Sequence, residues 1–139
     1  MQNKLLKALI LFLIGGILYT AMEIFCTGST HWSMLLLGGI CFLFIGQLNE
    51  SYSWDMAVTS QMLLSGAFIT AGEFITGCIV NLWWGLDVWD YSKLPYNLLG
   101  QISLKFSCLW VLVSFGAILL DDWLRWKLFG EEKPHYKWL

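Results

Sequence analysis

The chain has 139 residues, of which 58% are hydrophobic and only 13% are charged, and its formal net charge is -2. A soluble domain carries about 25% charged residues, so this composition indicates one small domain of an integral membrane protein. The near-neutral charge and the lack of a basic stripe argue against nucleic acid as a partner.

Four apolar stretches approach the roughly 20 residues that a helix needs to cross a bilayer, although the second is short. They predict helices at about residues 5–27, 33–49, 56–82 and 98–120. Short segments join the first three, an outer loop at 83–97 precedes the fourth, and a cytoplasmic tail at 121–139 follows it. We expect an all-α, polytopic protein whose single membrane domain covers residues 1–139.

The first apolar stretch begins like a signal peptide, with basic residues before an apolar centre. Its apolar run continues to about Cys26, and no small-x-small cleavage site follows. That length favours a retained membrane helix over a cleaved leader.

The basic residues predict the orientation of the helices. Six of the eight Lys and Arg residues flank the predicted bundle at its two ends: Lys4, Lys7, Arg125, Lys127, Lys133 and Lys137. The positive-inside rule then places both termini in the cytoplasm, although the inner loop at 50–55 has no Lys or Arg. We expect a multi-pass protein of the cell membrane.

Two pairs of similar segments indicate an internal repeat. "GGILYTAMEIF" at 15–25 resembles "SGAFITAGEFI" at 65–75, and "LLGGI" at 36–40 resembles "LLGQI" at 98–102. Two duplicated hairpins would then be related by a parallel pseudo-twofold axis along the membrane normal. Chance similarity between apolar segments is the alternative.

The first pair of segments places Glu23 and Glu73 inside apolar runs, on one stripe with Thr20 and Thr70 respectively. A charged carboxylate deep in a bilayer costs at least about 2.5–3.5 kcal/mol, so it normally faces a cavity or a charged partner. Counted at about 1.5 Å per residue, Lys105 lies at the depth of Glu73, and we expect the two to pair.

Two interpretations of these polar residues stay open. The glutamates, with Lys105, Gln101 and the two threonines, could line a binding site for a solute or ion. They could equally be a structural ion pair or a protonated, hydrogen-bonded acid, with the Gly and Thr stripes serving helix packing. The four cysteines are widely spaced and only two histidines occur, so we expect no metal site and no cofactor.

The predicted outer loop contains the most specific motif. "GEFITG" at 72–77, "WDYSKLPYNLLGQISL" at 89–104 and Trp110 resemble the CmpB-like family of small membrane proteins, described as ABC-transporter permeases. The resemblance implies a role in transport. That family often has a basic residue where Gln101 stands, and Lys105 would supply the charge. The chain has no G-x-x-x-x-G-K-[ST] motif of an ATPase.

The loop residues also have a direct physical interpretation. Asp90 and Ser92 can bond backbone amides in a turn, and Asn97 can cap the fourth helix. With the aromatic side chains of Trp89 and Tyr91, the segment is either a lid that dips toward the glutamates or a well-made turn at the interface.

Three functions follow from these observations. The first is a permease or transport component that binds a small polar solute or ion. The second is a non-catalytic accessory subunit that interacts with other membrane subunits or forms a homodimer. The third is an intramembrane enzyme that modifies lipids, against which the lack of a nucleophile–His arrangement counts. In each case the lipid bilayer is the immediate partner.

Overall fold

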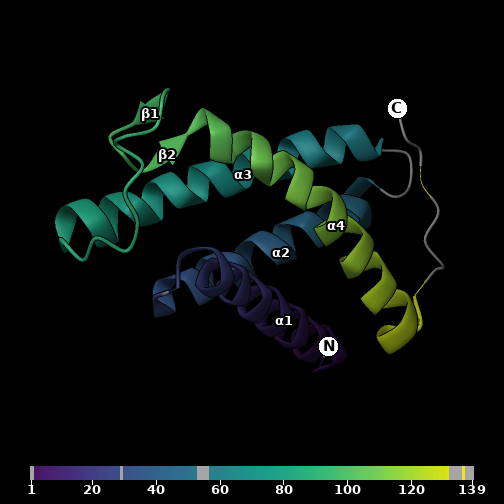
Figure 1. Ribbon diagram of the computed structural model, residues 1–139. Helices are drawn as coiled ribbons and strands as arrows, with labels where there is room; N and C mark the ends of the chain where they lie inside the picture. Colours follow the sequence, from purple (N-terminus) through teal and green to yellow (C-terminus); the bar gives the residue numbers. More distant parts are fainter. Residues whose placement is uncertain (1, 29, 53–56, 132–135, 137–139) are drawn as a thin grey trace.

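The computed structural model describes the chain except residues 1, 29, 53–56, 132–135 and 137–139 (Figure 1). The described residues form four α-helices: α1 (Gln2–Thr27), α2 (Trp32–Tyr52), α3 (Val58–Gly77) and α4 (Leu104–Phe129). A π-helix, η2 (Cys78–Trp83), continues α3, and two short antiparallel strands, β1 (Asn97–Leu98) and β2 (Ile102–Ser103), precede α4. The predicted all-α class is confirmed.

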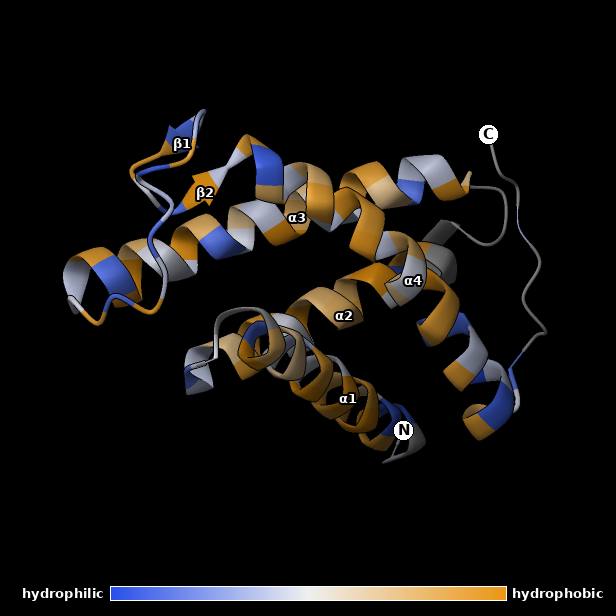
Figure 2. Ribbon diagram, in the orientation of Figure 1, coloured by the Kyte–Doolittle hydropathy of each residue, from blue (hydrophilic) through white to orange (hydrophobic). Residues whose placement is uncertain are grey.

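Three of these helical segments are long and apolar enough to span a membrane: Lys4–Phe25, Val58–Trp83 and Leu104–Phe129. The apolar part of α2, Trp32–Leu48, is shorter. Figure 2 shows hydrophobic residues along most of the length of the helices. Many of their large apolar side chains are exposed, such as Leu63 and Leu112 with 63% and 67% exposure. Such a surface suits contact with lipid rather than water.

The four helices pack as two neighbouring pairs with α2 in the middle. The most extensive contacts join α1 to α2 and α3 to α4, and α2 also contacts α3 and α4. Glycines allow the close approaches, since a Cβ at Gly16 would lie 2.5 Å from the Leu35 oxygen and one at Gly66 would lie 2.4 Å from Val111 Cγ2. Small residues commonly bring membrane helices together in this way.

The fourth helix begins at Leu104, so the prediction of a helix from residue 98 is wrong. Residues 97–103 instead form the β1–β2 hairpin, which reverses at Leu99 and Gly100 with φ angles of 54° and 74°. These left-handed conformations cannot continue an α-helix. Ser103 caps α4, and its Oγ accepts a hydrogen bond from the Phe106 amide at 3.3 Å, so the expected cap at Asn97 is also wrong.

This hairpin removes half of the proposed internal repeat. "LLGGI" at 36–40 is helical in α2, whereas "LLGQI" at 98–102 lies in the β-hairpin. The close approaches in the two helix pairs also differ, because Gly16 meets the start of α2 and Gly66 meets Val111, further along α4. Only the correspondence between α1 and α3 is compatible with the structure.

The first nine residues of the segment expected as a cytoplasmic tail, 121–129, belong to α4. The helix continues to Phe129 and is capped by Gly130, whose φ of 66° is the left-handed conformation that commonly ends a helix. Asp121, Asp122 and Arg125 are buried, and the Arg125 Nε donates to Asp121 Oδ2 at 2.9 Å. The bundle is therefore closed at this end by a buried ion pair.

Candidate functional site

Glu23 and Glu73 line one cavity at the end of the bundle near the long loop. The cavity has a volume of about 190 Å³. Its lining comes from α1, α3, α4 and the loop before β1: Tyr19, Met22, Glu23, Glu73, Val88, Trp89, Tyr91, Phe106, Leu109 and Trp110. Glu73 is only 3% exposed, whereas Glu23 is half-buried and hydrogen-bonds to Thr30.

Two neutral donors hold the Glu73 carboxylate. The Tyr19 hydroxyl donates to Oε2 and the Trp110 indole donates to Oε1, each at 3.4 Å. The two rings stack with their centroids 5.5 Å apart. Sequence reasoning missed Tyr19, although it lies four residues before Glu23 on the same helix face, and treated Trp110 only as a family motif.

Lys105 does not pair with Glu73, so that prediction is wrong. The Lys105 side chain is exposed, its Nζ lies 5.9 Å from the centre of the Phe106 ring, and no ion pair joins it to Glu73 in the described part of the chain. The cause is the late start of α4. Lys105 stands in the first helical turn, at the edge of the bundle, and not deep inside it.

Two aromatic residues of the loop reach the cavity. The Trp89 indole donates to the Gln101 carbonyl at 2.9 Å, and Tyr91 stacks on Phe106 with ring centroids 4.6 Å apart. Burial, followed by the nearby charges of Glu73 and Glu23, raises the pKa of Tyr91 well above its usual range. Its hydroxyl therefore stays protonated and can donate to Glu73. The loop therefore supplies two aromatic side chains to the lining of the cavity.

Gln101 holds the loop in place and does not line the cavity. Its Oε1 accepts from Asn81 on η2 at 2.8 Å, and its Nε2 donates to the Leu99 carbonyl at 3.0 Å. Asn81 in turn accepts from the Val88 amide at 2.7 Å. A Cβ at Gly77 would lie 2.5 Å from Gln101 Oε1, so the glycine of "GEFITG" makes room for this amide.

Asp90, Ser92 and Asn97 shape the exposed side of the loop. Asp90 Oδ1 accepts from the Ser92 amide at 2.9 Å, and this bond lowers the pKa of Asp90. Asn97 donates to the Leu94 carbonyl at 2.8 Å and accepts from the Gly100 amide at 3.0 Å. These three side chains fold the turn, and none of them lines the cavity.

The two threonines are also outside the cavity. Thr20 donates to the carbonyl of Gly16 on its own helix at 3.0 Å. Thr70 donates to the Ser107 hydroxyl at 3.1 Å and so connects α3 to α4. Both bonds serve helix structure and packing, which was one of the alternatives left open by the sequence.

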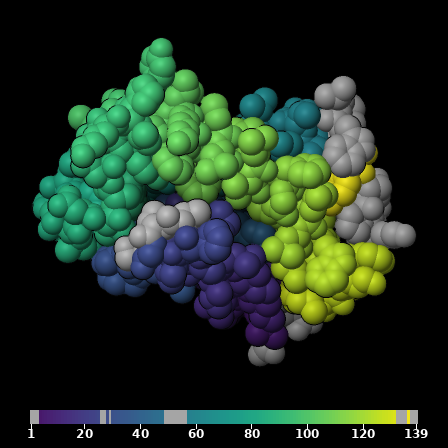
Figure 3. Space-filling view, viewed as in Figure 1, coloured from purple at the N-terminus to yellow at the C-terminus, as the bar shows by residue number. Residues whose placement is uncertain are grey.

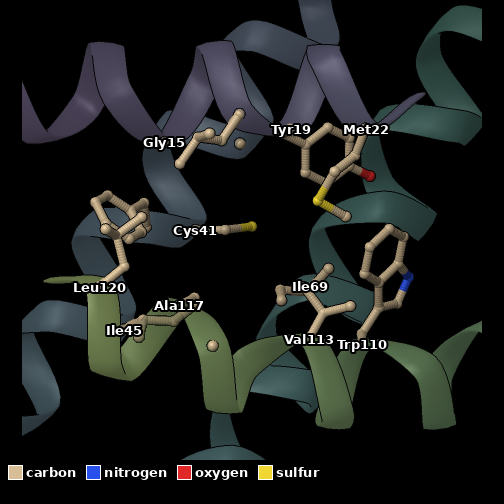
Figure 4. A pocket seen from close by; sticks show the side chains of 14 residues that line it. Gly15, Tyr19, Met22, Cys41, Ile45, Ile69, Trp110, Val113, Ala117 and Leu120 are labelled. Carbon is tan, nitrogen blue, oxygen red and sulfur yellow. The ribbon is translucent and has the colours of Figure 1, made fainter. Parts of the chain in front are cut away.

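An apolar groove adjoins the cavity between α1 and α4 (Figure 4). Its volume is about 270 Å³, and Tyr19, Met22 and Trp110 line both spaces. The Cys41 thiol points into the groove from α2, and the space-filling view shows a recess between the purple α1 and the green and yellow α4 (Figure 3). The apolar groove therefore lies next to the polar cavity, with Tyr19, Met22 and Trp110 at the boundary between them.

Residues 31–125 match the model of the family described as Putative ABC-transporter type IV. The chain belongs to this family. The family named from the "WDYS" loop and the "GEFITG" motif is thereby confirmed. No match was found among curated proteins or among solved structures.

The family match covers α2, α3, the loop and most of α4, but not α1. Glu73, Tyr91 and Trp110 therefore lie in the part that this chain shares with the ABC-transporter type IV family. Tyr19 and Glu23 come from the helix outside the match and complete the cavity from the other side.

The cavity combines acceptors with aromatic faces. In the part of the chain that the structure describes, no group of three or more His, Cys, Asp or Glu residues could hold a metal ion. The carboxylates of Glu23 and Glu73 can instead accept hydrogen bonds from a solute or balance a positive charge.

Proposed function

We propose that the protein is a membrane transport component, of the permease kind, that binds a small polar solute or ion in the cavity between Glu23 and Glu73. The observation that carries this proposal is the environment of Glu73. Its carboxylate is 3% exposed, and the side chains that donate to it, Tyr19 and Trp110, are neutral. An acid kept inside a membrane domain without a fixed counter-charge is a typical mark of a substrate or ion pathway.

The loop supports the same proposal. Trp89 and Tyr91 cover the cavity, and the Asn81–Gln101 bond holds the loop against η2. A structured cover over a buried acid is suited to controlling access from one side of a membrane. The π-helix beside it agrees with this view, because π-helical turns are frequent at functional sites.

The topology that we propose has four spans in the cell membrane, with α2 crossing alongside α1 and both termini in the cytoplasm. The charges near the termini support it through the positive-inside rule. In this arrangement the loop and the cavity lie toward the outer face. α1 and α3 run in the same direction, and Glu23 and Glu73 occupy corresponding positions on them. We retain this part of the duplicated-hairpin hypothesis.

Flux measurements in proteoliposomes test the proposal. The purified protein should increase the flux of K⁺, tetramethylammonium or another small polar solute over protein-free liposomes, and Glu73→Gln should abolish the increase. Thr70→Val is a matched control on the same helix, since Thr70 bonds Ser107 outside the cavity. Absence of flux for every solute tested with folded wild-type protein would overturn the proposal.

An accessory subunit without a transport site is the second candidate. The Thr70–Ser107 and Asn81–Gln101 bonds favour it, because these polar pairs fasten elements together and do not face the cavity. For such a subunit, Glu73→Gln would change the free energy of unfolding and leave the activity of any assembled complex unaffected at equal amounts of folded protein. The flux assay separates the two candidates.

A further inference from the structure

We propose that the substrate of this site is an amphiphilic organic cation, with its charged head in the cavity and its apolar tail in the groove between α1 and α4. This inference rests on the proposed function and specifies the substrate class. Two features of the structure carry it: the aromatic lining around two carboxylates, and an apolar groove that shares Tyr19, Met22 and Trp110 with that cavity.

The chemistry of the cavity fits an organic cation. Five aromatic residues line it, namely Tyr19, Trp89, Tyr91, Phe106 and Trp110, together with the two glutamates. Aromatic faces attract alkylammonium groups through the ring quadrupole, and cages of this kind recognise quaternary ammonium ligands. Among the described lining residues there is no Lys or Arg to compete for the glutamates. A bare inorganic cation such as Ca²⁺ would instead need six to eight oxygen ligands.

The groove supplies the place for the tail. Tyr19, Met22 and Trp110 stand at its junction with the cavity, and Figure 4 shows the Tyr19 and Trp110 rings together at one end, with Leu120 at the other. The combined volumes of about 270 and 190 Å³ fall in the range of about 300–1,000 Å³ that is usual for small-molecule sites. An amphiphile can therefore occupy both spaces at once.

The groove also has a lateral opening toward lipid. A Cβ at Gly116 on α4 would meet no atom within 4 Å, although Gly116 is one of the lining residues. The space-filling view also shows a recess between α1 and α4 (Figure 3). A tail can enter from the bilayer while the head moves under the loop.

Two other occupants fit less well. A helix of a second copy would fill the apolar groove but would supply no cation for Glu73 in the adjoining cavity. A phospholipid would bring its phosphate close to Glu23 and Glu73, and like charges repel strongly at low dielectric. A single-chain cation avoids both problems.

Photolabelling in phosphatidylcholine nanodiscs tests the inference. The probe is dodecyltrimethylammonium with a diazirine in its alkyl chain, and the neutral comparison is dodecyl maltoside with the same diazirine. We expect the cationic probe to label groove residues of α1, α2 and α4, identified by mass spectrometry, and the neutral probe to label them on the order of tenfold less. Equal labelling by both probes, or labelling spread over the outer helix faces, would overturn the inference.

A substitution in the groove provides a second test. Gly116→Phe fills open space, so the protein should fold and lose labelling by about tenfold. Leu112→Phe is the control, because Leu112 lies one turn away on α4, is 67% exposed and does not line the groove. If Gly116→Phe does not fold, Gly116→Leu takes its place. Wild-type labelling of a folded Gly116 variant counts against the inference.

The outcomes also distinguish this inference from the proposed function. Flux of tetramethylammonium or K⁺ without specific labelling by the dodecyl cation would refute an amphiphilic substrate, and the proposed transport site would be unaffected. Specific labelling without any flux, including flux of the labelled cation itself, would refute transport and leave a binding site for amphiphilic cations.

Discussion

The Tyr19 hydroxyl on α1 donates a hydrogen bond to the buried carboxylate of Glu73 on α3, across a distance of 3.4 Å. This contact joins the helix outside the family match to the acid inside it. It also places the Tyr19 ring on Trp110, whose indole donates to the same carboxylate. The site is therefore built from three helices. A substitution at Tyr19 or Trp110 should change the hydrogen bonding of the Glu73 carboxylate.

Tyr19→Phe should lower the free energy of unfolding by about 0.5–1.5 kcal/mol, because it deletes one hydrogen bond and keeps the ring. The donor–acceptor distance of 3.4 Å favours the lower part of this range. Chemical unfolding in detergent measures the change. Tyr96→Phe is the control, since Tyr96 is 81% exposed, and an equal effect of both changes would contradict the role given to Tyr19.

The turn at Asp90 should tolerate Asn and not Ala. An Asn side chain can accept the hydrogen bond from the Ser92 amide, whereas Ala leaves that amide without it. Limited trypsin digestion at Lys93 reports the order of the loop. Asp90→Ala should be cleaved faster than wild type, and Asp90→Asn at a similar rate. Equal rates for all three proteins would contradict a folded lid held by this bond.

The same turn should weaken in acid. The Ser92 amide lowers the pKa of Asp90, so the ionised carboxylate is favoured in the folded loop. A group with a lowered folded-state pKa adds stability above its unfolded-state pKa and loses it as the pH falls through the folded value. Pepsin digestion of the loop should therefore increase only at pH values below the usual range for Asp, and Asp90→Asn should remove this dependence.

Lys105→Gln should leave the free energy of unfolding within about 0.5 kcal/mol of wild type, which is usual for surface changes. Its side chain is exposed and lies beside Phe106 rather than beside Glu73. The depth count from sequence makes the opposite prediction of a large loss. Thermal or chemical unfolding of the variant decides between the two predictions. A loss of several kcal/mol in the free energy of unfolding would support the ion pair between Lys105 and Glu73.

Arg125→Gln should destabilise the protein by about 3–5 kcal/mol, because it removes the cation beside a carboxylate that is fully buried. A Cβ at Gly46 would lie 2.5 Å from Asp121 Oδ1, so the glycine on α2 makes room for this buried acid. Lys127→Gln, an exposed change in the same helical turn, is the control. Similar unfolding energies for the two variants would show that the pair contributes little.

Hydropathy and residue type predicted the helices and identified the two acids, because a long apolar run, and a carboxylate within it, can be recognised from residue order alone. The hairpin at 97–103 was not predictable in this way. It depends on left-handed backbone at Leu99 and Gly100, which the residue types of this segment do not reveal. The misplaced start of α4 then put Lys105 at the wrong depth and made it the expected partner of Glu73.

The donors to Glu73 could not be chosen from sequence either. Tyr19 and Trp110 are far from Glu73 along the chain, and many aromatic residues could have met it. Helix packing selects these two. The loop motif was more informative, because Trp89 and Tyr91 lie in the segment that identified the family, and both reach the cavity.

Flux through the reconstituted protein, compared between wild type, Glu73→Gln and Thr70→Val at equal amounts of folded protein, tests the central claim most directly. We predict that wild type and Thr70→Val conduct the same solute, and that Glu73→Gln loses flux by on the order of tenfold or more while remaining folded. Undiminished flux in folded Glu73→Gln would contradict a transport site at this acid.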